Sequence, residues 1–456
     1  MSTIEIRNPA NGNLVKTYEE MSEAELNTII DSTFNAFQEW KSTSFKTRSS
    51  LMRKAGEILR NNSREYAELM MIEMGKPIKS GISEVEKCAW CCDYFAENAE
   101  SFLAPEMVAT GASKSYVTYP PLGVVLAIMP WNFPFWQVFR FAAPGLMAGN
   151  VGILKHASNT TGCSVAIEEV FSKAGFPRNV FRSVIVSNQV IDEAIPNKKI
   201  AAVTLTGSTR AGMTVGEIAG SCLKKGVYEL GGSDPYLILA DADLVAAVEI
   251  CVASRLTNAG QSCIAAKRFI VVEEVKEEFE NLFVKKMSEV KMGDPAKEDT
   301  EMGPQARYDL RDALHRQVKE SIEKGAVCLL GGSIPNLAGA YYPPTVLTNV
   351  KKGMPAYEEE LFGPVAAIIP VKDEEEAVFV ANDSEFGLGA AVFTQNREKG
   401  EDIAANRLEA GSCFVNGLVK SDPRMPFGGI KHSGYGRELS RYGIQEFVNI
   451  KSVIVE

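Results

Sequence analysis

The stretch Gly123-Val-Val-Leu-Ala-Ile128 indicates the fold, because a short apolar run behind a glycine is typical of a buried strand. The segments after it alternate between helical and strand patterns. We expect helix at 138–147, strand at 151–155, helix at 160–174, strand at 201–205 and a further helix from Arg210. Strands that alternate with helices in this way form a parallel sheet with helices on both faces, as in dinucleotide-binding proteins.

Helices precede this region, and a second alternating region follows it. Ser22-Glu-Ala-Glu25 is a capping box, and the apolar residues after it recur on one helical face: Leu26, Ile29, Ile30, Phe37 and Trp40. The other expected helices are 51–59, 66–74, 82–102, 244–258 and 275–292, and the other expected strands are 268–272, 366–371 and 389–393. The segments 115–121 and 448–455 have the pattern of β ribbons, which are marginally stable alone.

The composition fits a soluble enzyme and excludes several other classes. The 456 residues are 45% hydrophobic and 23% charged, which excludes fibrous and disordered chains and leaves room for two or three domains. A net charge of -10, spread over many alternating Lys and Glu residues, disfavours nucleic acid as a partner. The N-terminus lacks a signal pattern and no window of about 18 residues is apolar throughout, so we expect a cytoplasmic protein that does not span a membrane.

Three loops shaped by glycine or proline each offer one reactive side chain. Asn132 lies in Pro-Trp-Asn-Phe-Pro, Glu229 in Glu-Leu-Gly-Gly-Ser-Asp-Pro, and Cys263 in Asn-Ala-Gly-Gln-Ser-Cys. A thiolate attacks a carbonyl carbon, an amide N–H stabilises the resulting oxyanion, and a carboxylate activates water. Taken singly, these residues would be a turn asparagine, a salt-bridged glutamate and a buried cysteine. Together they suffice to oxidise an aldehyde through a thioester.

The order and wording of these motifs resemble the aldehyde dehydrogenase superfamily. The resemblance continues through Glu360-Leu-Phe-Gly-Pro and through Pro426-Phe-Gly-Gly-Ile-Lys-His-Ser-Gly. It implies an α/β fold with a Rossmann-type cofactor-binding domain (1–110 and 123–230), an α/β catalytic domain (231–420) and a small β oligomerisation segment (111–122 and 421–456). It also implies a homodimer or a homotetramer.

The resemblance assigns chemical roles to the three reactive residues. Cys263 is the expected nucleophile, and the Asn132 amide and the Cys263 backbone N–H are the expected oxyanion donors. Loss of one such donor typically costs about 10²-fold to 10³-fold in rate. Glu229 is the expected general base that cleaves the thioester with water. Related enzymes that pass the acyl group to coenzyme A usually lack this base, so Glu229 favours hydrolysis.

A cofactor site is expected at the βα turn that contains Gly207 and Ser208, where glycine lets a pyrophosphate approach helix N-terminal amides. The resemblance adds further cofactor-binding residues: Trp131, Lys155 and Ser158, with Glu360 and Phe362 at the nicotinamide ribose and ring. Members that prefer NAD commonly carry Glu in place of Ser158, where it repels a 2'-phosphate. With Ser158 that repulsion is absent and Lys155 can pair with the phosphate. We therefore expect NADP, with NAD as the alternative.

The substrate is indicated by a resemblance to the succinate-semialdehyde dehydrogenase subfamily of short bacterial type. Arg140 matches an arginine that holds the distal carboxylate there, and Ser421 lies where that subfamily places a substrate-binding serine. Two residues depart from the subfamily: Thr257 replaces a second carboxylate-binding arginine, and Ala265 replaces a second cysteine that forms a redox-switching disulfide in some members. We expect oxidation of succinate semialdehyde to succinate, with a broad-specificity aldehyde dehydrogenase for aliphatic, aromatic or amino aldehydes as the alternative.

Two other classes fit the sequence less well. A zinc alcohol dehydrogenase needs clustered ligands, whereas the sequence has only three histidines, His156, His315 and His432, and its Cys88-x-x-Cys91-Cys92 run has no matching second pair. We therefore expect no metal. The nine cysteines, an odd number in a long chain, also argue against a disulfide framework. A non-catalytic protein with the same fold would be expected to lose the reactive cysteine or glutamate, and both are present.

Overall fold

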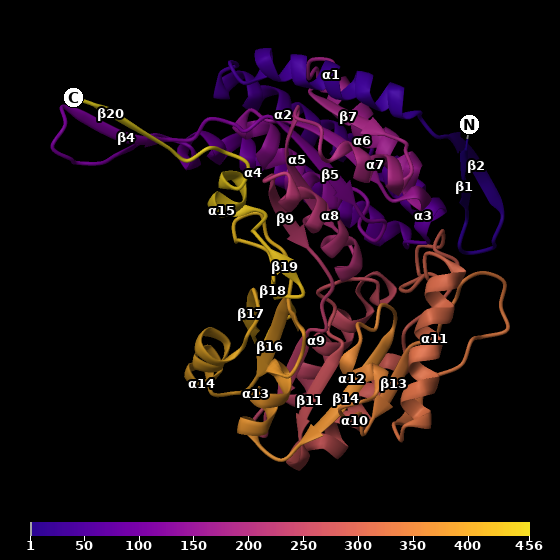
Figure 1. The fold of residues 1–456 in the computed structure, drawn as a ribbon. Helices are drawn as coiled ribbons and strands as arrows, with labels where there is room; N and C mark the ends of the chain where they lie inside the picture. Colours follow the sequence, from indigo (N-terminus) through magenta and orange to yellow (C-terminus); the bar gives the residue numbers. More distant parts are fainter. Residues whose placement is uncertain (1) are drawn as a thin grey trace.

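The computed structural model describes residues 2–456 and arranges them as two lobes, each built around a largely parallel sheet (Figure 1). A thin arm extends away from both lobes (Figure 1). The chain enters the second lobe after β9 (Lys225–Glu229) and returns to the first, where β19 (Gly434–Tyr435) pairs with β9. This is the predicted α/β class. Within residues 2–456 no helix combines the length and the apolarity that a membrane crossing requires.

The sheet of the first lobe has the strand order β19-β9-β8-β5-β6-β7. Its further strands are β5 (Val124–Met129), β6 (Val151–His156), β7 (Phe181–Val184) and β8 (Ile200–Thr206). All pairs are parallel except that of β19 with β9. The helices between the strands are α5 (Trp136–Ala148), α6 (Thr161–Lys173), α7 (Asn188–Ala194) and α8 (Thr209–Ser221), with the short 3-10 helix η1 (Ser158–Thr160). The strands predicted for this sheet are confirmed to within one residue at each end.

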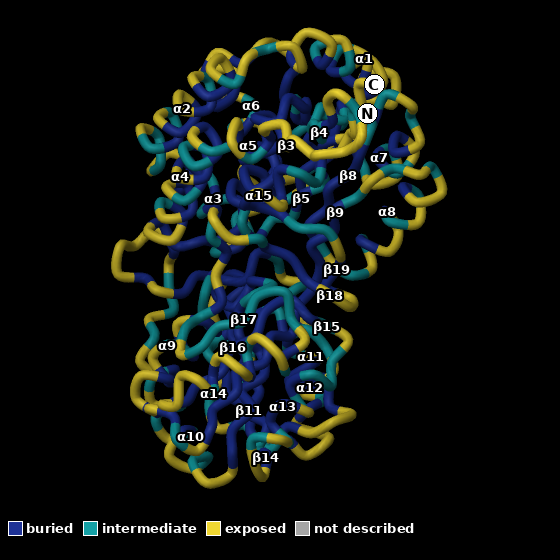
Figure 2. Tube along the Cα trace, turned by 90° about the vertical axis from the view of Figure 1, so that its left-hand side faces the viewer, coloured by how far each residue is buried: buried dark blue, intermediate teal, exposed yellow. Residues whose placement is uncertain are grey.

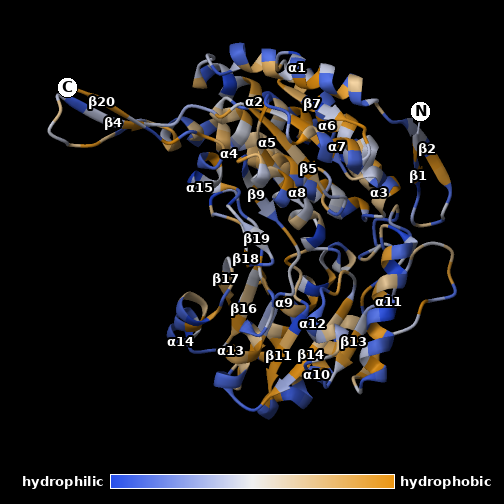
Figure 3. Cartoon of the chain, viewed as in Figure 1, coloured by the Kyte–Doolittle hydropathy of each residue, from blue (hydrophilic) through white to orange (hydrophobic). Residues whose placement is uncertain are grey.

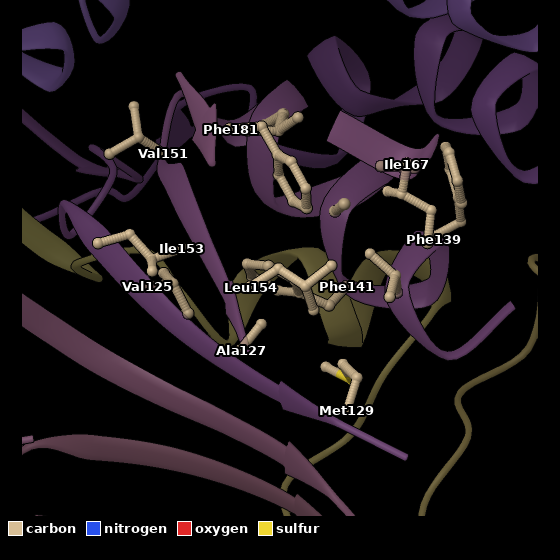
Figure 4. Packing of buried hydrophobic residues seen from close by; sticks show 14 of the residues in the cluster. Val125, Ala127, Met129, Phe139, Phe141, Val151, Ile153, Leu154, Ile167 and Phe181 are labelled. Atoms are coloured by element: carbon tan, nitrogen blue, oxygen red, sulfur yellow. The ribbon is translucent and has the colours of Figure 1, made fainter. Parts of the chain in front are cut away.

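The first sheet is covered on both faces, as expected for parallel strands that are mostly apolar. All residues of β6 are buried, and so are all residues of α5. Figure 4 shows side chains of β5 and β6 gathered with those of α5 and α6, among them Val125, Ala127, Phe139 and Ile167. Interiors packed in this way have low compressibility and deform little. The carboxyl ends of these strands are therefore firm supports for functional side chains.

Helices and one hairpin precede this sheet. The helices are α1 (Glu23–Trp40), α2 (Phe45–Asn61), α3 (Ser63–Met74) and α4 (Ile78–Phe102). The predicted capping box at Ser22 is confirmed, and α1 alternates between polar and apolar residues along its length (Figure 3). Helices α2 and α4 begin earlier than predicted; Ser44 caps α2 by accepting from the N–H of Thr47. The hairpin of β1 (Thr3–Arg7) and β2 (Leu14–Glu19) was not predicted, because its strands are short and its residues are mostly exposed.

The sheet of the second lobe has the order β12-β13-β14-β11-β10-β16-β17 and is parallel except at β12. Its strands are β10 (Pro235–Ile238), β11 (Arg268–Val272), β12 (Val327–Leu330), β13 (Thr345–Thr348), β14 (Val365–Val371), β16 (Gly389–Phe393) and β17 (Ser412–Val415). Its helices are α9 (Leu244–Leu256), α10 (Glu273–Ser288), α11 (Tyr308–Glu323), α12 (Pro355–Glu358), α13 (Glu374–Asn382) and α14 (Arg397–Asp402), with the 3-10 helix η2 (Thr257–Gly260) and the π-helix η3 (Ile403–Arg407).

Two predicted helices in this lobe were too long. The helix predicted at 244–258 ends at Leu256, because Asn258 and Ala259 both have a φ of 55°, which no α-helix accommodates. The helix predicted at 275–292 ends at Ser288, and Met292 forms an isolated β-bridge with Met302 instead. The first of these two deviations shapes the loop that carries Cys263.

The arm is a three-stranded antiparallel sheet of β20 (Lys451–Val455), β4 (Lys114–Thr118) and β3 (Glu106–Met107). Most of its residues are exposed (Figure 2). Residues 421–445 lie outside this arm, since β18 (Ile430–Lys431) pairs with β15 (Phe386–Gly387) and α15 (Ser440–Gln445) packs near α5. The projecting arm therefore does not coincide with residues 111–122 and 421–456, since it includes β3 and leaves out residues 421–445. The domain boundaries stay a prediction.

Candidate active site

The predicted catalytic and cofactor residues of the first lobe gather at one edge of its sheet. Because β5, β6, β8 and β9 are parallel, their carboxyl ends share this edge. The residues at or just after these ends are Trp131 and Asn132 after β5, Lys155 in β6, Ser158 after β6, Gly207 and Ser208 after β8, and Glu229 at the end of β9. Ligands of open α/β sheets bind at such an edge.

Cys263 is brought to this edge by a loop with unusual backbone angles. Asn258 and Ala259 are left-handed although neither is glycine, a conformation that costs energy and persists only where the surroundings hold it. The Asn258 side chain donates to the carbonyl of Asn132 (2.8 Å). Gly260 must be glycine, since its φ is 75° and a Cβ there would overlap the carbonyl oxygen of Gly363. The loop therefore positions its cysteine firmly.

Asn132 lies against the Cys263 loop. Its side-chain amide donates to the carbonyl of Gln261 at 3.1 Å, two residues before the cysteine, and the residue is 4% exposed. Its own carbonyl accepts from the Asn258 amide and from the Lys76 ammonium, at 2.8 and 2.9 Å. The structure thus brings together the amide and the thiol that the sequence placed in separate motifs.

A buried ion pair that the sequence did not reveal supports Asn132. Lys76 pairs with Glu84, and their side chains are 1% and 2% exposed. The carboxylate of Glu84 also accepts from the backbone N–H groups of Phe135 and Trp136, at 2.9 and 3.0 Å, at the start of α5. Burial lowers the pKa of Lys76, whereas the attraction of Glu84 raises it. The pair holds the loop between β5 and α5, where Asn132 lies.

The thiol of Cys263 is surrounded by protein and by charged groups. Burial raises its pKa to about 12, and the positive charges of Lys267 and Arg140 only partly oppose this shift. The ammonium of Lys267 is fully buried and donates to the carbonyls of Ser262 and Cys263, at 2.7 and 2.5 Å. At neutral pH the thiol therefore carries its proton, and the nucleophilic thiolate requires a proton acceptor nearby.

Glu229 lies at the end of β9 and is 2% exposed. Burial is the main cause that raises its pKa well above that of an ordinary carboxyl, followed by repulsion from Glu438; Arg140 and Arg437 oppose the shift. Among the described residues, neither of its carboxylate oxygens has a hydrogen-bond partner. A carboxyl whose pKa is raised holds a proton more readily, as a general base that accepts one from water must. Gly231 and Gly232 follow it, and a Cβ on either would crowd Glu360 or the Cys263 carbonyl.

Arg140 is held by a carboxylate that sequence reasoning missed. Its Nε lies 2.7 Å from the Oε2 of Glu438, and the two side chains are 2% and 3% exposed. The guanidinium also lies 4.6 Å from the ring centre of Phe427. Glu438 comes from the segment that pairs with β9, so no local sequence signal links it to Arg140. The pair and Glu229 form one buried cluster of charges.

A cavity of about 130 Å³ borders Cys263. It is lined by both predicted substrate residues, Arg140 and Ser421, and also by Thr257 and Lys87. The hydroxyl of Ser421 accepts from the indole N–H of Trp136 (3.0 Å) and from the Lys87 ammonium (2.9 Å). The structure therefore brings the predicted substrate residues to the nucleophile. Among the described residues, no group of three His, Cys, Asp or Glu side chains could hold a metal ion.

The predicted cofactor residues lie in two groups. In the first, Ser208 caps α8 by accepting from the N–H of Ala211, and the Lys155 ammonium donates to the side chain of Asn188 at 2.5 Å. In the second, the rings of Trp131 and Phe362 meet edge to face, with centroids 5.7 Å apart. Glu360 accepts from the N–H of Gly232 (3.0 Å) and lies 3.4 Å from Lys267, which joins the second group to the Cys263 loop.

Comparison with known proteins agrees with this geometry. The chain belongs to the aldehyde dehydrogenase family, whose family model matches residues 1–453, and it is an NAD(P)-dependent oxidoreductase of that family. The family resemblance and the fold class are thereby confirmed.

Among individual relatives, the chain is 50% identical to a probable succinate-semialdehyde dehydrogenase [NADP(+)] from Synechocystis sp., over 98% of both chains. It is 47% identical to a succinate semialdehyde dehydrogenase [NAD(P)+] from Escherichia coli, over 98% of this chain and 96% of the other. The crystal structure of succinic semialdehyde dehydrogenase from Streptococcus pyogenes in complex with NADP+ has a TM-score of 0.97 and 36% identity, and covers 99% of each chain.

Proposed function

We propose that this enzyme oxidises succinate semialdehyde to succinate through a thioester on Cys263, with NADP as its cofactor. The observation that carries the proposal is the cavity beside Cys263, which is bordered by Arg140 and Ser421. A cation and a hydroxyl beside the nucleophile suit an aldehyde whose other end is a carboxylate. The names of the relatives from Synechocystis and Escherichia coli point to the same substrate. A broad-specificity aldehyde dehydrogenase is not favoured.

In the first half of the reaction, the sulfur of Cys263 bonds to the aldehyde carbon while the carbonyl electrons move to oxygen. The Asn132 amide and the Cys263 N–H hold this oxyanion, an arrangement that acts on the charge as it develops. The thiol proton leaves to Glu229 once that carboxyl is ionised. Oxidised NADP, when bound, would supply the hydride acceptor, and the oxyanion electrons would re-form the carbonyl, so that an acyl thioester would remain on Cys263.

In the second half, water cleaves the thioester. Glu229 first releases the thiol proton to solvent, and its carboxylate then takes a proton from a water molecule, whose oxygen bonds to the acyl carbon while the carbon–sulfur bond breaks. Succinate leaves and the Cys263 sulfur is free again. The buried position of Glu229, with no hydrogen-bond partner among the described residues, suits a group that changes protonation during turnover.

The cofactor residues fit NADP. Within residues 2–456, Lys155 is buried without an ion pair, and burial lowers its pKa, so an anionic phosphate would supply the partner it lacks. Ser158 is exposed nearby and brings no negative charge. At Gly207 a Cβ would meet only ordinary contacts, so protein crowding does not explain this glycine, whereas close approach of a pyrophosphate does.

A panel of aldehydes with NADP and with NAD tests the proposal, with the reduced cofactor followed by absorbance. Succinate semialdehyde should exceed butanal in kcat/KM by roughly 10-fold to 100-fold, as one charged hydrogen bond provides. Equal rates for the two aldehydes would contradict the substrate. Ser158→Glu should lower kcat/KM with NADP relative to NAD, because a carboxylate repels the 2'-phosphate. An unchanged ratio would contradict the cofactor assignment.

We also propose that the arm of β3, β4 and β20 pairs with a neighbouring subunit in a homodimer or homotetramer. Strands β3 and β20 are mostly exposed, and small isolated sheets are marginal in water. Light scattering of the full chain should give a mass of two or four subunits. A monomeric mass would contradict the proposal.

A further inference from the structure

The charge of Arg140 is already balanced within the protein. Its guanidinium pairs with the buried carboxylate of Glu438, and Glu229 interacts electrostatically with both groups. A cation that is held by buried carboxylates contributes less net attraction to a substrate carboxylate than a free one. A second positive charge at the cavity beside Cys263 would therefore strengthen the binding of a substrate carboxylate. Thr257, which also lines this cavity, carries no charge.

Lys87 is a second cation at this cavity. It lies on α4, and its side chain borders the cavity beside Cys263 and also the wider groove outside it, which has a volume of about 430 Å³. Its ammonium donates to the hydroxyl of Ser421 at 2.9 Å and lies 4.3 Å from the ring centre of Trp136. The indole and the hydroxyl fix the end of an otherwise flexible side chain at the cavity wall.

No carboxylate of the described residues neutralises Lys87. It forms no ion pair within residues 2–456, and the acidic groups nearest to it are already engaged. Glu84 pairs with Lys76 and accepts from two backbone N–H groups, while Asp422 pairs with Arg424 at 2.7 Å. A partly buried ammonium without a carboxylate is unfavourable, and a ligand carboxylate would relieve this cost.

We infer that Lys87 binds the distal carboxylate of the substrate together with Ser421 and so determines the preference for carboxylated aldehydes. The inference rests on the proposed function and deepens it. Lys87 and Ser421 form one recognition unit, an ammonium and a hydroxyl 2.9 Å apart on the cavity wall, which matches the two oxygens of a carboxylate. Arg140 then has a second task, which is to balance the charges of Glu229 and Glu438.

The decisive experiment compares Lys87→Met with Lys79→Met. Both variants remove one lysine charge from α4, but Lys79 is exposed and lines only the outer groove. Lys87→Met should lower kcat/KM for succinate semialdehyde by roughly 10-fold to 100-fold and leave butanal within about threefold. Lys79→Met should leave both aldehydes within about threefold. Lys87→Arg keeps a cation and should retain part of the preference.

The pH profile gives a further test, because it would not change in this way if Lys87 had only a structural role. Burial is the main cause that lowers the pKa of Lys87 to about 8, followed by repulsion from Arg140; Glu84, Cys88 and Cys91 raise it. Asp422 also lies near enough to interact with it. As pH rises through this value, the ratio of kcat/KM for succinate semialdehyde to that for butanal should fall in the wild type. The ratio should stay flat in Lys87→Met, since proton steps shared by both aldehydes cancel.

The outcomes separate the inference from the proposed function. A wild type that treats both aldehydes alike contradicts the proposed function, and the inference with it. A wild type that prefers succinate semialdehyde, together with a Lys87→Met variant that keeps this preference, contradicts the inference alone. An equal loss of both activities in Lys87→Met would show a structural role and would likewise overturn the inference. Thermal unfolding of the variants identifies any loss of fold.

Discussion

Two buried cation–carboxylate pairs support the active site, and they differ in how well their polar atoms are satisfied. In the Lys76–Glu84 pair, the carboxylate accepts from the ammonium and from two backbone N–H groups. In the Arg140–Glu438 pair, the guanidinium also attracts Glu229, which Arg437 attracts as well, and apart from the Arg140 contact the oxygens of Glu229 and Glu438 have no hydrogen-bond partner among the described residues.

The satisfied pair supports the structure of the site, whereas the under-satisfied carboxyls take part in its chemistry. A fully satisfied buried pair fixes geometry and resists a change of charge. An under-satisfied group of carboxyls has raised pKa values and exchanges protons more readily, as burial does here for Glu229 and Glu438. The same Glu→Gln change should therefore act on different properties at the two sites. At Glu229 it should reduce activity, and at Glu84 it should reduce stability.

Glu229→Gln should produce the largest effect. Steady-state turnover of succinate semialdehyde should fall by roughly 10²-fold to 10⁴-fold, because no carboxylate remains to activate water. Rapid quenching and mass spectrometry should detect the acyl group on Cys263. The stability of the fold to urea should not decrease, since an amide replaces a desolvated carboxyl of the same size. Turnover within about tenfold of the wild type would contradict the role of this residue.

Glu84→Gln should instead lower the free energy of unfolding, by about 3 to 5 kcal/mol, because it leaves the buried Lys76 ammonium without its counter-charge. Urea titration followed by fluorescence measures the change. A double variant, Lys76→Met with Glu84→Gln, should regain part of the loss, since it removes both charges. If the single variant is as stable as the wild type, the two pairs do not differ in the way we describe.

A change in pH should give the smallest effect. Burial raises the pKa of both Cys263 and Glu229, so their ionised, reactive forms increase as pH rises. The kcat/KM for butanal, which has no carboxylate, should therefore increase from roughly pH 6 to roughly pH 9. The folded state holds the Glu229 proton more tightly than the unfolded chain, so stability should fall as pH rises above the ordinary carboxyl range. Glu229→Gln should remove that component, and a rate that decreases over this range would contradict the assignment.

The sequence predicted the parallel sheet of the first lobe, because β5 is apolar over its whole length and β6 is apolar over its first four residues. It did not predict the end of α9, where tertiary contacts hold Asn258 in a left-handed conformation against its helical pattern. Nor did it predict the hairpin of β1 and β2, whose residues are largely exposed.

The candidate site was predictable where a motif carries its own signal, as around Asn132, Glu229 and Cys263. The charges that surround them were not. Glu438 meets Arg140 from almost three hundred residues away in the chain, so only the fold reveals the pair. Lys87 lies in an amphipathic helix, where a lysine ordinarily faces solvent, and only the fold places it at the cavity, beside Ser421 and Trp136.

The contact between Gly260 and Gly363 has a consequence for redesign of this enzyme. Because the two backbones touch there, the loop that carries the thiol and the loop that carries Phe362 cannot be altered independently. A library that varies position 260 would push these loops apart and misplace sulfur and aromatic ring together. Engineers who seek new aldehydes should leave that contact intact and vary the side chains that line the cavity instead, such as Thr257 and Ser421.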